Sequence, residues 1–397
     1  MILGSIIALG PLTIDMYLPA LPTITTELLT TEAVVQLTLT GTLLGLALGQ
    51  LIVGPLSDAL GRRRPLIAGV SLHVVASLLC MIAPNIAVLG GLRVLQGMGA
   101  AAGSVIALAI VRDLYTGREA GVLFSRLILV MGTAPVIAPT LGGELLRFTS
   151  WRGVFGAIAL FGLVLIPVAF LGLRETLPPA RRRTAGLRGT LRDYGSLFGD
   201  RTFVGLIIVA GLAMSALLAY VSGSSFVFQG QYGLDQQEFG LLFGSGAIWL
   251  ILATQLNPVV LRWFEPRQIL LAAVSGGAVA GLTLVTIAAT AAGGLAGVVG
   301  GMWAVLFCTG FALPNAPAVA LSRHGETAGT AAALLGAVQF GVGALISPVV
   351  GVLGNDALAM GSVVAAGMVL ALVVLVTVVK PWTLENLEPR GTAGTAG

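Results

Sequence analysis

A charged side chain is unusual inside a long apolar stretch of sequence, and Asp15 and Arg93 are two residues of this kind. Asp15 lies in the stretch Ile2–Leu21, and Arg93 lies in the stretch Leu92–Ile110. An apolar environment disfavours the ionised form of a carboxyl group, so an aspartate there can bind a proton and release it when water reaches it. A cation in such a place is costly and normally has a partner and a purpose. We therefore expect proton binding at Asp15, with Arg93 as a nearby or relay charge that tunes it.

Both residues also have a simpler interpretation. Arg93 could bond only the carbonyl groups of a neighbouring helix, and Asp15 could be solvated or hydrogen-bonded at the outer end of the first helix. The sequence alone leaves these alternatives open.

The remaining reactive side chains do not suggest an enzyme. Neither histidine, His73 or His324, is arranged with a nucleophile or with further metal ligands. The two cysteines, Cys80 and Cys308, both lie in apolar stretches, which argues against a disulfide framework or a zinc site. Cofactor-binding motifs are missing from the sequence as well. We therefore expect no catalytic residue, no metal ion and no cofactor.

The elements that must position Asp15 and Arg93 are membrane-spanning helices. Of the 397 residues, 56% are hydrophobic and only 10% are charged, whereas a soluble domain has about 25% charged residues. The apolar stretches approach the ~20 residues that cross a bilayer as a helix, and the alternating pattern of membrane strands is absent. We predict an all-α membrane protein with twelve transmembrane helices. The stretches are Ile2–Leu21, Thr38–Val53, Leu66–Ile82, Leu92–Ile110, Val122–Leu145, Val154–Leu173, Phe203–Val227, Leu241–Val260, Ile269–Ala288, Val298–Leu321, Thr330–Leu353 and Met360–Val379.

One long polar segment divides these stretches into two sets of six. It is rich in arginine and contains Pro178 and Pro179, as expected of a linker. The predicted organisation is an N-terminal half over residues 1–173, a cytoplasmic basic linker over 174–202, a C-terminal half over 203–380 and a cytoplasmic tail over 381–397. A binding site between the halves, near the middle of the membrane, would suit this plan.

The basic residues orient the predicted bundle. If both termini are cytoplasmic, nearly all loop arginines face the cytoplasm, and only Arg147 and Arg152 lie in an outer loop. This is a strong positive-inside bias. The formal net charge of +4 therefore reflects topology and contact with membrane lipids, and it does not indicate nucleic-acid binding.

The most specific motif is the string from Gly54 to Leu66, GPLSDALGRRRPL. Its two glycines, Gly54 and Gly61, permit a tight turn between close helices. Asp58 can face a helix N-terminus or an arginine, and Arg62 can pair with an acidic helix end. The string resembles the signature loop of the major facilitator superfamily. The resemblance further implies an inner gate in which Arg62 pairs with Asp113, the second residue of the dipeptide Arg112-Asp113.

Two further motifs resemble the same superfamily. Arg93–Ala101 is similar to its second motif. The fifth apolar stretch is similar to the motif of its antiporters, although Ala138 stands where a glycine is common. Prolines four residues apart bend a helix, and glycines permit close packing. The residues concerned in this antiporter-like helix are Pro135, Pro139, Gly142 and Gly143.

A narrower resemblance extends through both halves. The string Gly10–Pro22, GPLTIDMYLPALP, is similar to the first helix of the Bcr/CflA group of drug:proton antiporters. Trp151-Arg152, Arg174–Leu177, Tyr220–Phe226 and Ala328–Ala331 continue the similarity, although Ser225 stands where the group often has proline. The resemblance implies a monomeric exporter of the bacterial cytoplasmic membrane. A proton gradient would drive it and would take the place of a cofactor.

The expected substrate is a small amphipathic, largely neutral molecule, such as a phenicol or a similar drug. An uptake symporter or facilitator of the same fold is the alternative, and a membrane enzyme or receptor is a more distant one. We expect polar and aromatic residues of facing helices to form the substrate pocket. The candidates are Tyr17, Gln36, Thr40, Gln96, Tyr220, Ser222, Phe226, Trp249, Asn315, Gln339 and Phe340.

The predicted orientation can be tested by labelling introduced cysteines with a membrane-impermeant thiol reagent. Positions 183 and 380, native Arg183 and Lys380, should react only after the membrane is opened, because positive loops stay inside. Position 235, native Asp235, should react in intact cells. Reaction of position 183 from outside intact cells would reverse the orientation.

Overall fold

The structure, a computed structural model, describes residues 2–115, 117–182, 194–322 and 328–383. Over these residues the regular secondary structure is helical, and twelve helical segments are long and apolar enough to cross a membrane. The predicted all-α membrane fold with twelve spans is therefore confirmed. In the N-terminal half the long helices are α1 (Ile2–Asp15), α3 (Glu32–Leu60), α4 (Arg63–Met81), α5 (Ile86–Leu114), α6 (Gly117–Leu146) and α7 (Trp151–Gly172).

The C-terminal half repeats this arrangement. Its first helix begins at Arg201, inside the segment expected to be linker, because the Asp200 side chain caps it by accepting hydrogen bonds from the N–H groups of Thr202 and Phe203 at 2.9 and 3.2 Å. A short π-helical segment, Phe226–Gln231, follows that helix. The helices are α9 (Arg201–Ser225), α10 (Gln236–Val260), α11 (Pro266–Thr290), α12 (Gly294–Leu321), α13 (Ala328–Leu353) and α14 (Ala357–Val374).

Most helices extend beyond the apolar stretches, because polar residues cap their ends. Asn85 accepts a hydrogen bond from the Val88 N–H at 3.0 Å and starts α5 six residues before its apolar stretch. Asp235 starts α10 with a capping box in which Glu238 bonds back to the Asp235 N–H. Hydrophobicity marks the part of a helix that lies in lipid, whereas caps mark where the helix ends.

The first span is broken into three pieces. After α1 come a 3-10 turn, Leu18–Ala20, and the short helix α2, Leu21–Glu27. Proline at position 19 has no N–H to bond the carbonyl of Asp15, so the regular helix ends there. Asp15 is consequently the last residue of α1.

Small residues let the helices of each half approach closely. A Cβ atom on Gly45 of α3 would lie 2.1 Å from the carbonyl oxygen of Val94, and one on Gly97 of α5 would lie 2.1 Å from that of Thr42. Both positions therefore require glycine. Close approach of this kind replaces the hydrophobic effect as the main attraction between helices in lipid.

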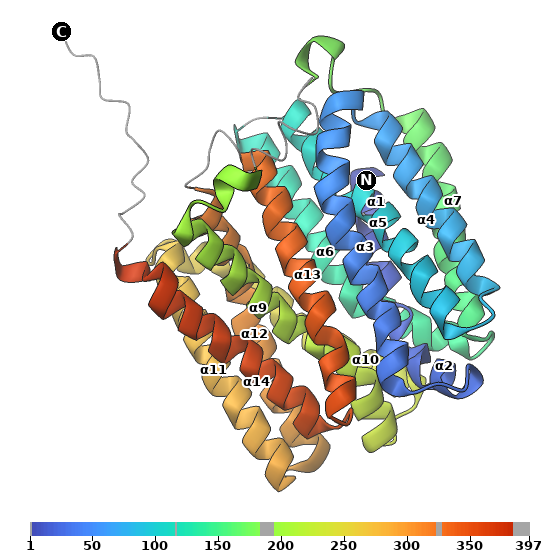
Figure 1. Ribbon diagram of the computed structural model, residues 1–397, viewed down its shortest axis with the longest axis vertical. Coiled ribbons are helices and arrows are strands. Elements are labelled where there is room, and N and C mark those ends of the chain that lie inside the picture. Colours follow the sequence, from blue (N-terminus) through green and yellow to red (C-terminus); the bar gives the residue numbers. More distant parts are fainter. Residues whose placement is uncertain (1, 116, 183–193, 323–327, 384–397) are drawn as a thin grey trace.

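The two halves meet along two helix pairs, α3 with α13 and α6 with α10 (Figure 1). We call the two ends of the bundle the Arg62 end and the Gln36 end, after residues near the two ends of α3. Ile2, Arg201 and Lys380 lie at the Arg62 end, where the described chain begins and finishes.

The residues that mark the predicted topology lie at the two ends of the bundle as the sequence predicts. Lys380 ends the last span at the Arg62 end, and Asp235 caps α10 at the Gln36 end. Arg147 and Arg152 also lie at the Gln36 end, on either side of the turn between α6 and α7. Arg183 lies outside the described residues, as do His324 and residues 384–397 of the expected tail.

Candidate functional site

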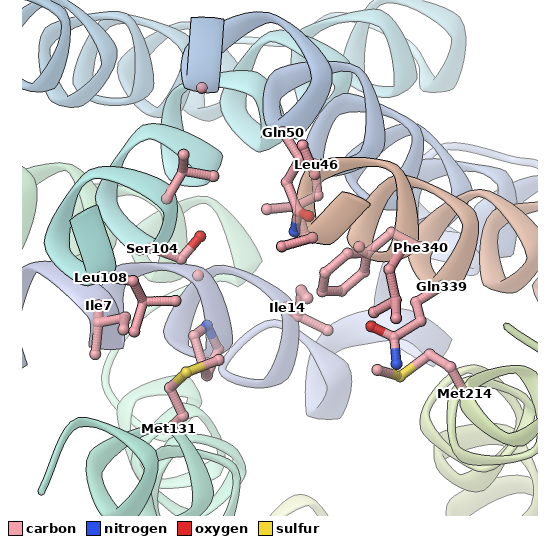
Figure 2. A pocket seen from close by; sticks show the side chains of 18 of the residues that line it. Ile7, Ile14, Leu46, Gln50, Ser104, Leu108, Met131, Met214, Gln339 and Phe340 are labelled. Carbon is pink, nitrogen blue, oxygen red and sulfur yellow. The ribbon is translucent and has the colours of Figure 1, made fainter. Parts of the chain in front are cut away.

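A cavity of about 480 Å³ lies between the two halves. Figure 2 shows side chains of both halves pointing into it, with Met131 of α6 facing Met214 of α9. The cavity runs from Asp15 to the Arg62 end, where it is lined by Asp58, whose side chain is 40% exposed. Much of the lining is apolar, and polar groups are placed along it. These polar groups include Asp15, Gln50, Ser104, Tyr194, Tyr220 and Gln339.

The opposite end of the cavity is closed by contacts between the halves. The Gln36 side chain of α3 donates hydrogen bonds to Asn355 Oδ1 at 2.6 Å and to the Ser222 carbonyl at 3.2 Å. The Ser225 hydroxyl of α9 donates to the Leu18 carbonyl at 2.8 Å. The structure is therefore accessible from the Arg62 end and sealed at the Gln36 end.

Asp15 lies at the deep end of this cavity. The residue is only 4% exposed, and among the described residues it has no hydrogen-bond or ion-pair partner. Tyr220 of α9 lines the same region from the other half, and its hydroxyl donates to the Phe243 carbonyl at 3.4 Å. A carboxyl group without a partner is stable here only if it is protonated, hydrated or bound by a ligand.

Arg93 lies on the other side of α1 and does not pair with Asp15. Its guanidinium group donates to the Thr13 carbonyl at 3.0 Å and to Gln96 Oε1 at 2.5 Å. It also lies over the rings of Tyr17 and Phe155, with its carbon 4.5 and 5.5 Å from the ring centroids. These contacts match the simpler interpretation, in which Arg93 bonds a neighbouring helix. A tuning role would have to act through the backbone of α1.

The contacts of Arg93 belong to a buried polar network that sequence reasoning missed. Gln96 donates to the Ser77 hydroxyl at 2.7 Å, and His73 Nε2 lies 2.8 Å from the Thr13 hydroxyl. Because that hydroxyl donates to the Leu9 carbonyl at 2.6 Å, it accepts from His73. This network ties α1 to α4 and α5 over the turns that precede Asp15.

Arg62 is the centre of a charged cluster at its end of the bundle. Its guanidinium group donates to Asp58 at 2.5 Å, to Asp113 at 2.8 Å and to the Ser57 hydroxyl at 2.8 Å. Burial opposes the charge, but the hydrogen bonds and charges of Asp113 and Asp58 outweigh it and raise the pKa of Arg62. The structure thus brings together the pair Arg62–Asp113 that the family resemblance implied.

The segment after α7 holds this cluster in place, a feature that the motif did not reveal. The Glu175 carboxylate accepts hydrogen bonds from the N–H groups of Arg62, Arg63 and Leu177 at 2.8, 3.2 and 3.0 Å. Burial acts to raise the pKa of Glu175, but these bonds outweigh it and lower that pKa. Gly61 has a φ of +92° and no room for a Cβ atom beside Glu175, so the turn requires glycine.

The other inner-gate residues lie at the mouth of the cavity. Gly54 and Arg112 line it on the N-terminal half, and Gly329 and Thr330 in the first turn of α13 line it on the other half. Asp58 therefore faces the mouth that the N-terminus of α13 borders. The attraction between a carboxylate and a helix N-terminus would act when this end closes.

The antiporter-like helix contributes to the closed end. α6 continues without interruption through Pro135 and Pro139, and Pro135 lines the cavity. A Cβ atom on Gly142 would lie 2.0 Å from the Met16 carbonyl oxygen, and one on Gly143 would lie 2.5 Å from that of Gln236. The two glycines therefore let α6 contact the break in the first span and the start of α10.

Three of the predicted pocket residues, Tyr220, Gln339 and Phe340, line the cavity. The other eight do not line it in this structure, because their side chains make other contacts, and their role in binding stays a prediction. They are Tyr17, Gln36, Thr40, Gln96, Ser222, Phe226, Trp249 and Asn315.

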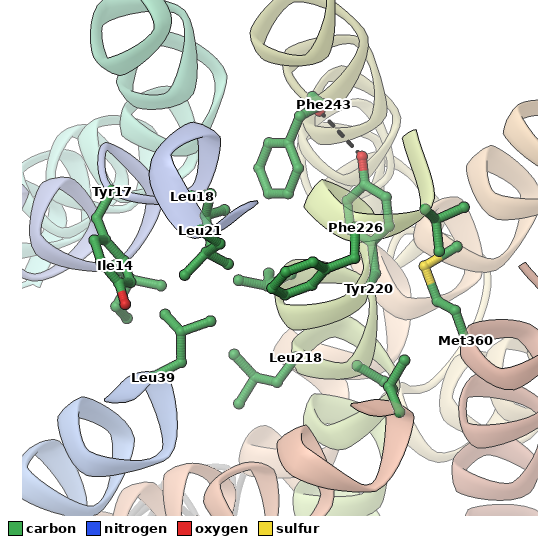
Figure 3. Close-up of a cluster of buried hydrophobic side chains, with 14 of the residues drawn as sticks. Ile14, Tyr17, Leu18, Leu21, Leu39, Leu218, Tyr220, Phe226, Phe243 and Met360 are labelled. Atoms are coloured by element: carbon green, nitrogen blue, oxygen red, sulfur yellow. Dashed lines mark hydrogen bonds between the residues drawn. The ribbon is translucent and has the colours of Figure 1, made fainter. Parts of the chain in front are cut away.

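The eight candidates that do not line the cavity lie in three other environments. Tyr17 and Gln96 contact Arg93 inside the N-terminal half. Figure 3 shows Phe226 among the buried apolar side chains near the closed end, where Gln36 and Ser222 bond each other. The remaining three pack between or outside helices: Asn315 bonds Asn257 at 2.6 Å, Trp249 is 38% exposed beside Trp303, and the hydroxyl of the half-buried Thr40 has no partner among the described residues.

Sequence reasoning missed several lining residues. Gln50 was detectable as an amide inside a span. Its side chain lies against Gly336 of α13 in the other half, and both residues line the cavity. Met131, Met214 and Leu217 carry no polar signal and resemble residues that face lipid or core. Adaptable methionine side chains suit a cavity that accepts ligands of different shapes.

Comparison with known proteins bears on the whole chain. A family model described as Major Facilitator Superfamily matches residues 3–348. The chain belongs to the major facilitator superfamily. Membership identifies it as a membrane transporter rather than an enzyme.

Relatives narrow the position within the superfamily. The chain is 38% identical to the uncharacterized MFS-type transporter YdgK of Bacillus subtilis, over 91% of this chain and 90% of that protein. It is 30% identical to a bicyclomycin resistance protein homolog of Haemophilus influenzae, over 98% and 97%. It is 33% identical to a chloramphenicol resistance protein of Pseudomonas aeruginosa, over 85% and 81%. The predicted resemblance to bicyclomycin- and chloramphenicol-type exporters is confirmed.

A solved structure supports the fold of this superfamily member. The Escherichia coli xylose transporter XylE, in a partially occluded inward open conformation, aligns with a TM-score of 0.69 at 14% identity. The alignment covers 94% of this chain and 96% of XylE. At this identity the similarity concerns the fold alone.

The charged cluster predicts a separation between turnover and binding. Arg62→Ala leaves Asp58 and Asp113 as unpaired acids, and Asp58→Asn weakens the group that faces α13. We expect both to lower the rate of transport by about tenfold or more, since ~1.4 kcal/mol in a conformational equilibrium is tenfold. Substrate affinity should change by less than about twofold, because Asp15 and the deep cavity are untouched.

The measurement is transport by purified protein in liposomes, alongside equilibrium binding. Arg64→Ala is the matched control, because Arg64 belongs to the same loop but is exposed. A loss of binding with a normal rate of conformational cycling would contradict a gating role for the cluster.

Proposed function

We propose that this transporter exports small amphipathic, drug-like molecules in exchange for protons across the bacterial cytoplasmic membrane. The observation that carries the proposal is the position of Asp15. An acidic residue without a partner among the described residues lies at the deep end of a cavity between the two halves. Such a residue can bind a proton from one side and release it to the other.

The cavity supports a substrate of moderate size and mixed character. Its volume of about 480 Å³ lies in the range of sites for drug-sized ligands, ~300–1,000 Å³. Apolar side chains such as Leu108, Met131 and Phe340 offer contact area, and Gln50 and Gln339 offer hydrogen bonds. A phenicol or a similar compound fits this description, and one relative is named a chloramphenicol resistance protein, another a bicyclomycin resistance protein homolog.

Alternating access supplies the movement. The halves are sealed at the Gln36 end and separated at the Arg62 end, and a second state would reverse this arrangement. In that state the N-terminus of α13 would approach Asp58, while the contacts of Gln36 and Ser225 across the halves would break. The Arg62 cluster would then stabilise one of the two states.

The basic residues support a proposed orientation. We propose that the Arg62 end is cytoplasmic, because it carries Arg62, Arg63, Arg64 and Arg112 together with the basic segment after α7. Both ends of the chain would then be cytoplasmic. The cavity would load its substrate from the cytoplasm and release it outside, which is the direction of export. The protein is expected to act as a monomer.

The coupling predicts how substrate binding depends on pH. In an exchanger, protonation of Asp15 and binding of substrate oppose each other, so each weakens the other by the same factor. Affinity should therefore rise by about tenfold or more as pH increases from about 5.5 to about 8.5 and Asp15 loses its proton. In a symporter of the same fold, affinity would instead rise as pH falls.

Asp15→Asn imitates the permanently protonated residue. It should abolish uphill efflux driven by a pH gradient in proteoliposomes, and it should flatten the pH dependence of binding. Folding should survive, because a neutral amide is less costly to bury than a carboxylate. Asp235→Asn makes the same chemical change at a helix cap outside the cavity and should behave as wild type. Normal gradient-driven efflux by Asp15→Asn would remove this residue from the mechanism.

A further inference from the structure

The break in the first span leaves part of a backbone carbonyl group free. In an uninterrupted helix, the N–H of residue 22 would bond the Leu18 carbonyl, but residue 22 is proline and has no N–H. The N–H of Leu21 reaches this carbonyl in the tighter 3-10 pattern. A carbonyl oxygen has two lone pairs, so one acceptor position remains for another donor.

That donor comes from the other half of the protein. The Ser225 hydroxyl donates to the Leu18 carbonyl at 2.8 Å, and Ser225 and Leu18 are both fully buried. Gln229 donates to Ser225 Oγ at 2.8 Å and to the Pro19 carbonyl at 3.4 Å. The three groups form a chain of hydrogen bonds from α9 to the break, and such chains strengthen each member.

Both sides of this contact are irregular. Leu18 lies in the 3-10 turn that follows Asp15 by three residues, and Ser225 is the last residue of α9 before the π-helical segment Phe226–Gln231. Irregular turns of this kind rearrange more easily than the interior of a regular helix, and they often mark functional hinges. Movement of the chain at Asp15 therefore reaches the contact directly.

We propose that the Ser225 hydroxyl and the Leu18 carbonyl form a latch, with Gln229 as its support, that holds the Gln36 end closed. The latch opens when the transporter changes state. Ser225 is thus a positioning residue, which acts on the conformational equilibrium and touches no substrate. The proposal rests on the alternating access of the proposed function, and it does not depend on proton coupling.

The neighbouring residue provides a matched control. Ser224 is also fully buried, but its hydroxyl donates at 3.4 Å to the Val221 carbonyl of its own helix. Ser224→Ala and Ser225→Ala remove the same atom from adjacent positions, and only Ser225→Ala removes a bond between the halves.

The test measures the distance across the Gln36 end by double electron–electron resonance. Spin labels are placed at Leu29→Cys and Ala292→Cys, two exposed positions on different halves, after Cys80 and Cys308 are replaced by alanine. Ser225→Ala should increase the ratio of open to closed distances by about threefold to tenfold, the effect of losing one net hydrogen bond. Because the latch is uncharged, the factor should be the same from about pH 5.5 to about pH 8.5, and Ser224→Ala should keep the wild-type ratio.

A second variant weakens the same hydrogen bond by offering its acceptor, the Leu18 carbonyl, a competing donor. Pro22→Ala restores an N–H that can bond the Leu18 carbonyl in place of Ser225. It should also favour the open distances. The combination of Pro22→Ala with Ser225→Ala should shift the ratio less than the product of the two single factors, because both act on one interaction.

Three results would overturn the latch: a wild-type ratio in Ser225→Ala, an equal shift in Ser224→Ala, or independent effects of Pro22→Ala and Ser225→Ala. A lower thermal stability with unchanged distances would likewise assign Ser225 a purely structural role. Efflux in proteoliposomes is measured separately. Absence of proton-driven efflux by the wild-type protein would refute the proposed function. The distance measurement would still show whether the latch exists.

Discussion

The need to keep the Asp15 carboxyl group in an apolar cavity without a protein partner constrains the rest of the structure. An ionised carboxylate in such surroundings costs several kcal/mol unless something compensates it. Nothing among the described side chains does so permanently, and the proposed compensation is a proton, water or a substrate. The cavity and the separation of the halves at the Arg62 end give access to this group.

The arrangement of Arg93 is consistent with this constraint. A salt bridge from Arg93 would fix Asp15 in its ionised form and would remove it from exchange with protons. Instead, the guanidinium group lies behind α1, where it bonds the Thr13 carbonyl and stacks on Tyr17 and Phe155. Together with His73 and its partner Thr13, it holds α1 against α4 and α5. The N-terminal half thus supports Asp15 mechanically while leaving its carboxyl group free.

The charges at the two ends of the cavity have different tasks. At the Arg62 end the acids are paired, and Glu175 fixes the backbone of the signature loop while Asp58 and Asp113 neutralise Arg62. At the Gln36 end the contacts between the halves are made by amides, hydroxyls and carbonyl groups, and the amides of Asn355 and Gln237 also bond the carboxylates of Glu32 and Glu144. The uncharged bonds among them can break and reform with little change in their hydration cost, which suits an end that must open in every cycle.

The fold and the charged sites were predictable because each leaves a strong local signal. Twelve apolar stretches define twelve spans, and a lone aspartate or a glycine–arginine loop stands out against them. The pocket was not predictable, because a polar residue in a span faces either the cavity or another polar residue. Asn315 bonds Asn257 and Gln36 bonds Asn355, whereas Gln339 lines the cavity. In the sequence, all three are simply amide side chains near or within an apolar stretch. Apolar lining residues such as Met131 leave no signal at all.

In the proposed mechanism, substrate and proton compete for one group, the Asp15 carboxyl. The most direct measurement of this competition is proton release when a ligand binds to the purified protein in weakly buffered detergent. The release is followed with a pH indicator, with chloramphenicol as the first probe. Near the pH at which Asp15 is half protonated, saturating ligand should release a substantial fraction of one proton per molecule, and Asp15→Asn should release none. Binding without any proton release across the pH range, or equal release from Asp15→Asn, would contradict the account.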